Sequence, residues 1–151
     1  IGAYPGGWSQ VSSKIIKNGK IMSLDIKKMD PLENISFLQC DFLEESTKDK
    51  IFKFFNEKLD VVLSDMAANT TGNKSLDCIR TNQLCMDVID FSSQILKPHG
   101  VLVTKLFMGE DFLLAKELAK SRFKKVQFFK PNASRGESRE TYLHCSILKT
   151  L

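Results

Sequence analysis

One carboxylate, Asp65, stands where open α/β sheets place the groups that bind ligands. It follows the apolar run 59–64, which predicts a buried strand, and it begins the polar, glycine-containing loop 65–73. In such sheets ligands bind beyond the carboxyl ends of the strands, so Asp65 is a candidate functional residue. An aspartate in this place can also do no more than cap a turn, and this stretch alone leaves both interpretations open.

A second candidate site is the glycine-rich turn at the start of the sequence. Gly2, Gly6 and Gly7 would let the backbone approach a ligand closely before a helix begins. Their spacing differs from the G-x-G-x-x-G of dinucleotide-binding turns, and there is no G-K-[ST] phosphate loop. Asp25, at the end of the next expected strand, suits ribose hydroxyls, and Asp41, after the following one, could reach an adenine amino group. A turn with two such acids favours S-adenosylmethionine, although a plain strand-to-helix turn would use the same glycines.

The elements that would position these residues alternate between strands and helices. We expect helices over 8–17, 46–58, 76–96 and 111–122, and strands over 20–26, 35–38, 59–64, 101–107, 126–129 and 142–148. This alternation predicts an α/β fold with a mainly parallel sheet and helices on both faces. The last two strands are joined by a polar loop without a helix, so they should be antiparallel. The apolar positions that define the first three helices are Val11, Ile15 and Ile16; Ile51, Phe52, Phe54 and Phe55; and, expected to face inward, Ile79, Leu84, Val88, Phe91 and Ile95.

The 151 residues are enough for one domain with a core, and they contain no internal repeat, linker or second domain. A sheet of this class should have its first strand just before Gly2, where only a stub stands, so we expect N-terminal residues to be missing from the sequence. No apolar run approaches the roughly 18 residues of a membrane span, and the N-terminus does not resemble a signal peptide. We therefore expect no membrane association.

The cysteines and histidines are a poor metal-binding set. The four cysteines are widely spaced and form no C-x-x-C pair, and there are only two histidines. We expect no metal site. Scattered, reduced cysteines also fit a cytosolic type of compartment.

The net charge of +4 is unevenly spread along the sequence. Residues 116–151 hold nine Lys/Arg and three Glu, whereas the preceding 115 residues hold thirteen Lys/Arg and fifteen Asp/Glu. A basic end on a nearly neutral body favours an anionic partner such as nucleic acid. The charge alone fits a solvated surface equally well.

Five motifs in order resemble those of the FtsJ/RrmJ-type ribosomal RNA large-subunit 2′-O-methyltransferases, the RlmE-like family. The resemblance covers essentially the whole chain. The motifs are Gly2-Ala3-x-Pro5-Gly6-Gly7-Trp8-Ser9-Gln10, Met29-Asp30-Pro31, Phe37-Leu38-Gln39-x-Asp41-Phe42, Ser64-Asp65-Met66-Ala67-x-Asn69-x-x-Gly72, and Lys130-Pro131-x-x-Ser134-Arg135-x-x-Ser138-Arg139-Glu140-x-Tyr142.

The resemblance implies a Rossmann-like S-adenosylmethionine-dependent methyltransferase domain over 1–151. It implies catalytic roles for Asp65, Lys105 and Glu140, which match three members of the family's Lys-Asp-Lys-Glu tetrad. The first lysine of that tetrad lies upstream of the glycine turn in the family and has no counterpart in this sequence. Tyr4 and Ala68 depart from the usual Ala and Pro. The residues implied to contact the cofactor are Gly2, Pro5, Gly6, Gly7, Trp8, Asp25, Asp41 and Asp65.

The implied reaction is methyl transfer to a ribose 2′-hydroxyl, which requires alignment and proton removal. Lys105 interrupts an apolar strand, where an unpaired ammonium is expensive to bury. We expect it to position the hydroxyl and accept its proton, with Asp65 and Glu140 orienting it, although a lysine there could also reach solvent. Two carboxylates favour the protonated form of a lysine, and a second lysine would offset this. Without that lysine, we expect this chain to be inactive or weakly active.

The resemblance also points to the substrate. We expect Lys130, Arg135 and Arg139, in the loop that ends at Glu140, to bind RNA phosphates, with Lys120, Lys124 and Lys125 extending the basic surface. The target implied is a uridine in the peptidyl-transferase region of large-subunit ribosomal RNA, on the RNA or the ribosomal subunit. The protein is expected to be a monomer in the cytoplasm, or in a mitochondrion or other organelle.

Three alternatives stay open from the sequence. The first is a catalytically impaired module on the same fold that binds RNA or assists ribosome assembly. The second is a small-molecule methyltransferase, which the basic end disfavours. The third is a 2′-O-methyltransferase that acts on transfer RNA or a messenger cap.

Overall fold

The structure is a computed structural model that describes residues 1–150, and it divides the chain into two compact units, Ile1–Glu57 and a second that begins at Lys58. The strands form two sheets, one of two strands in the first unit and one of four strands in the second.

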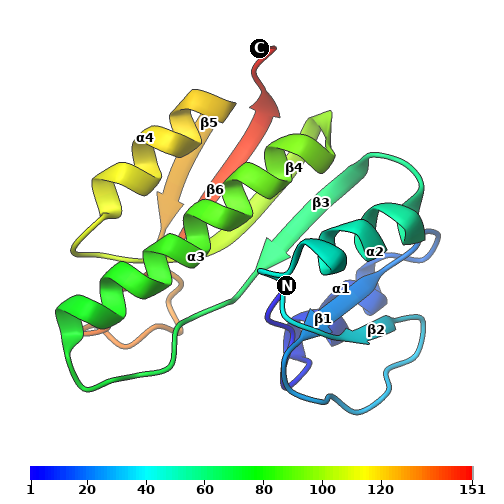
Figure 1. Cartoon of the computed structure of the whole chain (residues 1–151), viewed down its shortest axis with the longest axis horizontal. Helices are drawn as coiled ribbons and strands as arrows, with labels where there is room; N and C mark the ends of the chain where they lie inside the picture. The colour runs from blue at the N-terminus through cyan, green and yellow to red at the C-terminus, as the bar shows by residue number, and fades with distance from the viewer. Residues whose placement is uncertain (151) are drawn as a thin grey trace. The chain divides into compact units, whose positions relative to one another are not determined.

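The first unit is built on two short parallel strands. Its elements are α1 (Gly7–Ile15), β1 (Met22–Asp25), β2 (Ser36–Gln39) and α2 (Glu45–Phe55) (Figure 1). β1 and β2 pair in register from Met22↔Ser36 to Asp25↔Gln39. The expected stub of a preceding strand runs beside β1, where the amide of Ala3 donates to the carbonyl of Leu24 over 3.1 Å.

The second unit holds a four-stranded sheet. Its elements are β3 (Leu59–Ser64), α3 (Lys74–Ile95), β4 (Leu96–Phe107), α4 (Phe112–Arg122), β5 (Phe123–Phe129) and β6 (Glu140–Leu148). The strand order is β3-β4-β6-β5. β3 runs parallel to β4, whereas β6 is antiparallel to both β4 and β5. Only β6 is therefore reversed in this sheet, so the predicted α/β class and the antiparallel C-terminal strand are confirmed.

The core of the second unit lies between one face of this sheet and the helices α3 and α4, which lie side by side over it (Figure 1). Leu102 and Leu106 of β4 and Leu143 of β6 are fully buried on that face. Ala115 and Ala119 of α4 are also fully buried, and their small side chains allow the helix to approach closely. No helix of the described residues 1–150 is long and apolar enough to cross a bilayer.

One prediction about a helix face is wrong. On α3, Ile79 is 39% exposed, whereas Thr81 and Asn82 are fully buried. The inward stripe of α3 runs through these polar residues, which a search for large apolar side chains passes over. On α1, Val11 and Ile15 are exposed, and Ser9 is the buried residue, its hydroxyl 2.6 Å from that of Ser23 in β1. The helix thus meets β1 through its polar first turn.

A truncation in the sheet core should destabilise the protein far more than the same change at the surface. Leu143→Ala should lower the free energy of unfolding by about 2–5 kcal/mol, because Leu143 is fully buried and its removal leaves a cavity. Leu113→Ala, at a position that is 68% exposed, should change it by less than about 0.5 kcal/mol. Urea unfolding followed by circular dichroism measures both, and equal effects would contradict the placement of this core.

Candidate active site

The centre of the candidate site is Lys105, near the end of β4. Its neighbours Thr104 and Leu106 point into the buried core, so strand alternation turns Lys105 to the opposite face of the sheet. Asp65 follows directly after β3, the parallel neighbour of β4. Glu140 begins β6, which runs the other way. The reversed direction of β6 therefore brings its first residue to the edge where β3 and β4 end.

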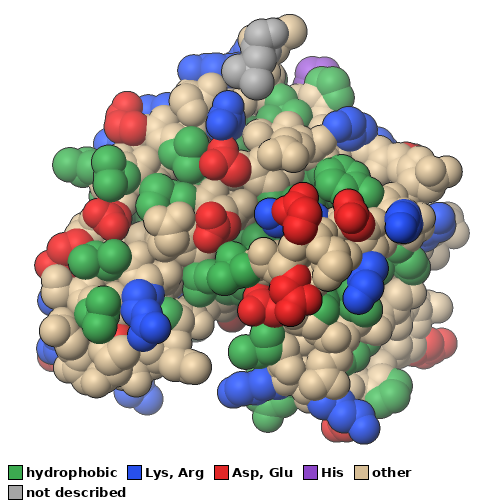
Figure 2. All heavy atoms as spheres, viewed as in Figure 1, with side chains coloured by type: hydrophobic (Ala, Val, Ile, Leu, Met, Phe, Trp, Pro, Cys, Tyr) green, Lys and Arg blue, Asp and Glu red, His purple; other side chains and the backbone are tan. Residues whose placement is uncertain are grey.

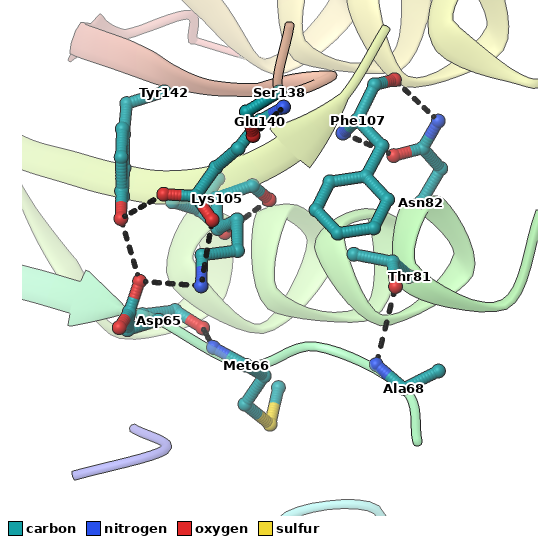
Figure 3. A network of polar contacts seen from close by, with 12 residues as sticks. Asp65, Met66, Ala68, Thr81, Asn82, Lys105, Phe107, Ser138, Glu140 and Tyr142 are labelled. Carbon is teal, nitrogen blue, oxygen red and sulfur yellow. Dashed lines mark hydrogen bonds and ion pairs between the residues drawn. The ribbon is translucent and has the colours of Figure 1, made fainter. Parts of the chain in front are cut away.

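Lys105 lies between two carboxylates. Its Nζ is 3.1 Å from Oδ1 of Asp65 and 3.4 Å from Oε2 of Glu140 (Figure 3). The Lys105 side chain is only 12% exposed, and the two carboxylates are about one-third exposed. The structure thus brings together the three side chains predicted from the sequence. An ammonium this far removed from water needs such partners, because an unpaired buried charge is costly.

Tyr142 completes the cluster, and sequence reasoning did not assign it a role. Its hydroxyl oxygen lies 2.7 Å from Oδ1 of Asp65 and 3.2 Å from Oε1 of Glu140, so its one proton is donated to one carboxylate at a time. Tyr142 is also the register partner of Lys105 across β4 and β6. Its ring stacks on Phe129 with centroids 5.7 Å apart. Alternation along a strand puts Glu140 and Tyr142 on one face, and this spacing could have predicted that Tyr142 lies beside Glu140.

The environment of Tyr142 keeps its hydroxyl protonated. Burial, and then the hydrogen bond to Asp65, raise the pKa of the Tyr142 phenol well above its usual value. The cluster therefore holds one ammonium, two carboxylates and one neutral hydroxyl. Such a group can orient an incoming hydroxyl and exchange a proton with it.

The predicted cofactor residues of the first unit share one edge of its sheet. The Oδ2 of Asp25 accepts a hydrogen bond from the amide of Tyr4 over 2.9 Å, which ties the glycine turn to the end of β1. The amide of Cys40 donates to the carbonyl of Asp25, so Asp41 follows at the end of the neighbouring strand. The turn therefore contacts Asp25, and Asp41 follows the neighbouring strand end, while Trp8 lies in the first turn of α1.

The glycine turn has a backbone that other residues would strain. The Tyr4–Pro5 peptide is cis, and Gly2 and Gly6 have φ of 68° and 122°. A Cβ on Gly6 would lie 3.2 Å from Sδ of Met29. Positive φ and this close contact together require glycine at position 6. Tyr4, which stands where the family usually has alanine, is half-exposed, and Nζ of Lys27 lies 5.1 Å from its ring centroid.

Two of the three predicted RNA-binding residues contact the protein itself. Nζ of Lys130 donates to the carbonyls of Gly136 and Ser138, over 3.1 Å and 2.7 Å. Nη1 of Arg139 donates to Sγ of Cys78 over 3.4 Å. Arg135 is exposed at the tip of the same loop. Lys130 and Arg139 therefore brace the loop, although both are exposed, as Arg135 is.

The charge on the face drawn in Figure 2 is mixed. Basic side chains are scattered over it, whereas acidic side chains gather over α2, where Glu44, Glu45 and Asp49 are exposed. The basic charge of the C-terminal part therefore makes no continuous patch on this face. Among residues 1–150, no group of three or more His, Cys, Asp or Glu is placed to hold a metal ion.

Comparison with known proteins gives a consistent result. A model of the FtsJ-like methyltransferase family matches residues 1–147. Ribosomal RNA large subunit methyltransferase E of Pelagibacter ubique (strain HTCC1062) is 43% identical over 99% of this chain and 73% of its own length. The protein of the same name from Rickettsia akari (strain Hartford) is 48% identical over 95% of this chain. The chain spans 66% of the length of that relative.

Solved structures show the same fold. A crystal structure described as a ribosomal RNA methyltransferase of Plasmodium falciparum superposes with a TM-score of 0.86 and 30% identity, covering 98% of this chain and 84% of its own. Human methyltransferase-like protein 13 in complex with SAH superposes with a TM-score of 0.69 over 97% of this chain and 69% of its own. Its 14% identity supports the fold alone.

The raised pKa of Tyr142 predicts how stability depends on pH at the alkaline end. Above pH about 10 the phenol ionises in the unfolded chain but stays neutral in the folded one. Its contribution to stability is therefore complete below that pH and falls above it, by about 1.4 kcal/mol per pH unit. Tyr142→Phe should lack this part of the decline when urea unfolding is measured across the alkaline range. Tyr4→Phe, at a half-exposed tyrosine, should keep it, and parallel curves for wild type and Tyr142→Phe would contradict the assignment.

Proposed function

The chain belongs to the FtsJ-like methyltransferase family, and from this premise we propose that it methylates large-subunit ribosomal RNA at the 2′-hydroxyl of a uridine. The observation that carries this proposal is the Lys105 ammonium, held 3.1 Å from Asp65 and 3.4 Å from Glu140 at a sheet edge. The names of the two curated relatives support ribosomal RNA as the substrate.

Lys105 aligns the ribose 2′-hydroxyl of the substrate and accepts its proton. Asp65 and Glu140 fix the direction of its side chain, and Tyr142 fixes the two carboxylates in turn. With its side chain held in this way, Nζ of Lys105 lies at a defined point for the ribose oxygen. Nζ first releases its own proton to solvent, and the neutral amine then accepts the hydroxyl proton as the ribose oxygen bonds to the methyl group and the bond from that methyl group to sulfur breaks. Alignment and proton removal are what the reaction requires of the protein.

The first unit supplies residues that fit S-adenosylmethionine. This cofactor provides the methyl group on a sulfonium, a good leaving group, and carries no phosphate. The turn at Gly2–Gly7 leaves bare backbone, and a Cβ at Gly6, whose φ is 122°, would crowd Sδ of Met29 at 3.2 Å. Asp25 and Asp41 follow neighbouring strand ends, where carboxylates can accept hydrogen bonds from ribose hydroxyls and an adenine amino group. Gly7, Pro5 and Trp8 complete the assignment in this turn.

The loop 130–139 supplies the RNA contact nearest to the chemistry. Lys130 and Arg139 hold the loop in shape by their bonds within the protein. Arg135 presents an exposed guanidinium five residues before Glu140. A phosphate bound there would orient the ribose chain without reading its sequence.

Replacing Lys105 should abolish catalysis and leave cofactor binding intact. Lys105→Met keeps the aliphatic length of the side chain but removes the amine, so the methyl transfer of this chain, which is expected to be weak without the upstream lysine, should fall by about a further hundredfold. Lys97→Met is the matched control, because Lys97 is also on β4 and pairs with Asp60 at 2.8 Å near the opposite end of the strand. Transfer of labelled methyl groups to ribosomal RNA and calorimetry with the cofactor measure the two properties.

The position of the methyl group tests the substrate. A 2′-O-methyl group protects the adjacent phosphodiester from alkaline cleavage, so the cleavage pattern of the product RNA locates it. Protection at a uridine of large-subunit RNA is expected. A methyl group on a base, on transfer RNA or on a cap would contradict this part of the proposal. Wild-type transfer by Lys105→Met would contradict the role of Lys105, and an inert protein that binds RNA would favour the assembly-module alternative.

The two kinds of basic residue in the loop should behave differently toward salt. Arg135→Ala removes one phosphate contact, so RNA affinity should fall and the slope of log affinity against log salt should decrease by about one. Lys130→Ala should loosen the loop and increase its amide exchange at the same time. Lys53→Ala, an exposed lysine on α2, is the control. An unchanged salt slope in Arg135→Ala would remove Arg135 from the RNA interface.

A further inference from the structure

Two rows of side chains on α3 reach two different loops of the candidate site. In the first row, Oδ1 of Asp77 accepts hydrogen bonds from the amide and the hydroxyl of Thr71, over 2.8 Å and 2.7 Å. One turn later, Oγ1 of Thr81 accepts from the amide of Ala68 over 3.1 Å (Figure 3). Residues four apart share one side of a helix. This row therefore holds the loop that begins at Asp65.

The second row holds the end of β4. Nδ2 of Asn82 donates to the carbonyl of Phe107 over 2.9 Å, and its Oδ1 accepts from the amide of Phe107 over 2.8 Å (Figure 3). Nδ2 also donates to the carbonyl of Glu110 over 2.8 Å. Four residues earlier, Sγ of Cys78 lies 3.8 Å from the carbonyl of Met108. This row therefore holds the segment that begins two residues after Lys105.

The side chain of Asn82 hydrogen-bonds the last residue of β4, Phe107, beyond the point where β3 stops pairing with β4. β3 pairs with β4 only as far as Ser64↔Thr104. The amide of Met108 donates to the carbonyl of Arg139, next to β6, so in an antiparallel ladder the polar groups of Phe107 point to the other side. The carboxamide of Asn82 offers them one donor and one acceptor, as a peptide group would.

Thr81 and Asn82 are fully buried, and their hydrogen bonds offset the cost of burying polar groups. Thr81 is bonded three residues after Asp65, at Ala68. Asn82 is hydrogen-bonded to Phe107, and the residue of β6 that pairs with Phe107 is Glu140. Because the two side chains are adjacent on one helix, their separation is fixed. The hydrogen bond to Thr81 also depends on Ala68, which stands where the family usually has proline, because a proline has no amide hydrogen to donate.

We propose that Thr81 and Asn82 are positioning residues that set the distance between Asp65 and Lys105 from their place on α3. This rests on the proposed function for the meaning of that distance, but the geometry can be tested without activity. A purely structural role would lower stability and leave the Asp65–Tyr142–Glu140 contacts of the folded protein unchanged. A positioning role changes those contacts in the folded protein.

The sharpest test reads the hydroxyl of Tyr142, which donates to Asp65. The sequence has only two tyrosines, so carbon-13 labelling of tyrosine Cζ gives two resonances by NMR, with Tyr4 as an internal reference. Asp65→Asn defines the direction of the shift when the bond to the carboxylate is weakened. Thr81→Val and Asn82→Leu, which keep side-chain volume, should move the Tyr142 resonance in that direction. Thr81→Ser, which keeps the hydroxyl, should restore it.

The matched control is Thr47→Val. Thr47 is fully buried on α2, and its hydroxyl has no hydrogen-bond partner within the described residues. The same chemical change there should leave the Tyr142 resonance in place. If Asn82→Leu does not fold, the comparison of Thr81→Val with Thr81→Ser tests the proposal by itself. An unmoved Tyr142 resonance in folded Thr81→Val would overturn the proposal, whatever reaction the protein catalyses.

A kinetic measurement gives a second, independent readout. Thr81→Val should reduce kcat for methyl transfer by about tenfold to a hundredfold, as expected for a small misplacement of reacting groups, with little change in the Kd of the cofactor. Thr81→Ser should recover most of the rate. A loss confined to thermal stability, with kcat per folded molecule unchanged, would also overturn the proposal.

Discussion

The ammonium of Lys105 is the constraint around which the second unit is arranged. It stands on a central strand among buried neighbours, and a charge there persists only with partners at short range. Two carboxylates supply them, one from the residue after β3 and one from the first residue of β6. Tyr142 then fixes the carboxylates, since its hydroxyl lies within hydrogen-bond distance of both. The ion cluster thus depends on three strands whose ends meet at one edge of the sheet.

The reversed strand β6 makes that meeting possible. Parallel strands alone would bring only carboxyl ends to this edge. Because β6 runs antiparallel to β4, its start lies beside their ends, and Glu140 and Tyr142 enter two residues apart on one face. The loop before it is braced by Lys130 and Arg139, so two basic residues of that loop serve the geometry of the site. α3 adds the remaining restraint through buried polar side chains.

The same principle organises the first unit on a smaller scale. Asp25 ends β1 and Asp41 follows β2. The glycine turn is tied to β1, where the amide of Tyr4 donates to the Asp25 carboxylate and the amide of Ala3 donates to the carbonyl of Leu24. Its functional groups are carboxylates and bare backbone, which suit a polar ligand without phosphate better than a phosphorylated one. In both units, the chemistry stands at strand ends, where the side chains are held by the sheet and still open to a ligand.

The sequence by itself determined the order of strands and helices, the strand over 59–64, the reversed last strand, and Asp65, Lys105 and Glu140 as a group. Periodicity and turn residues report local conformation, and family motifs add the roles. Tertiary structure decided the rest. Tyr142 meets Asp65 across 77 positions of sequence, exposed Lys130 and Arg139 bond within the protein and brace a loop, and Thr81 and Asn82 are buried in place of Ile79. Such contacts depend on strand register and helix rotation, and a one-residue shift in either would point each of these side chains elsewhere.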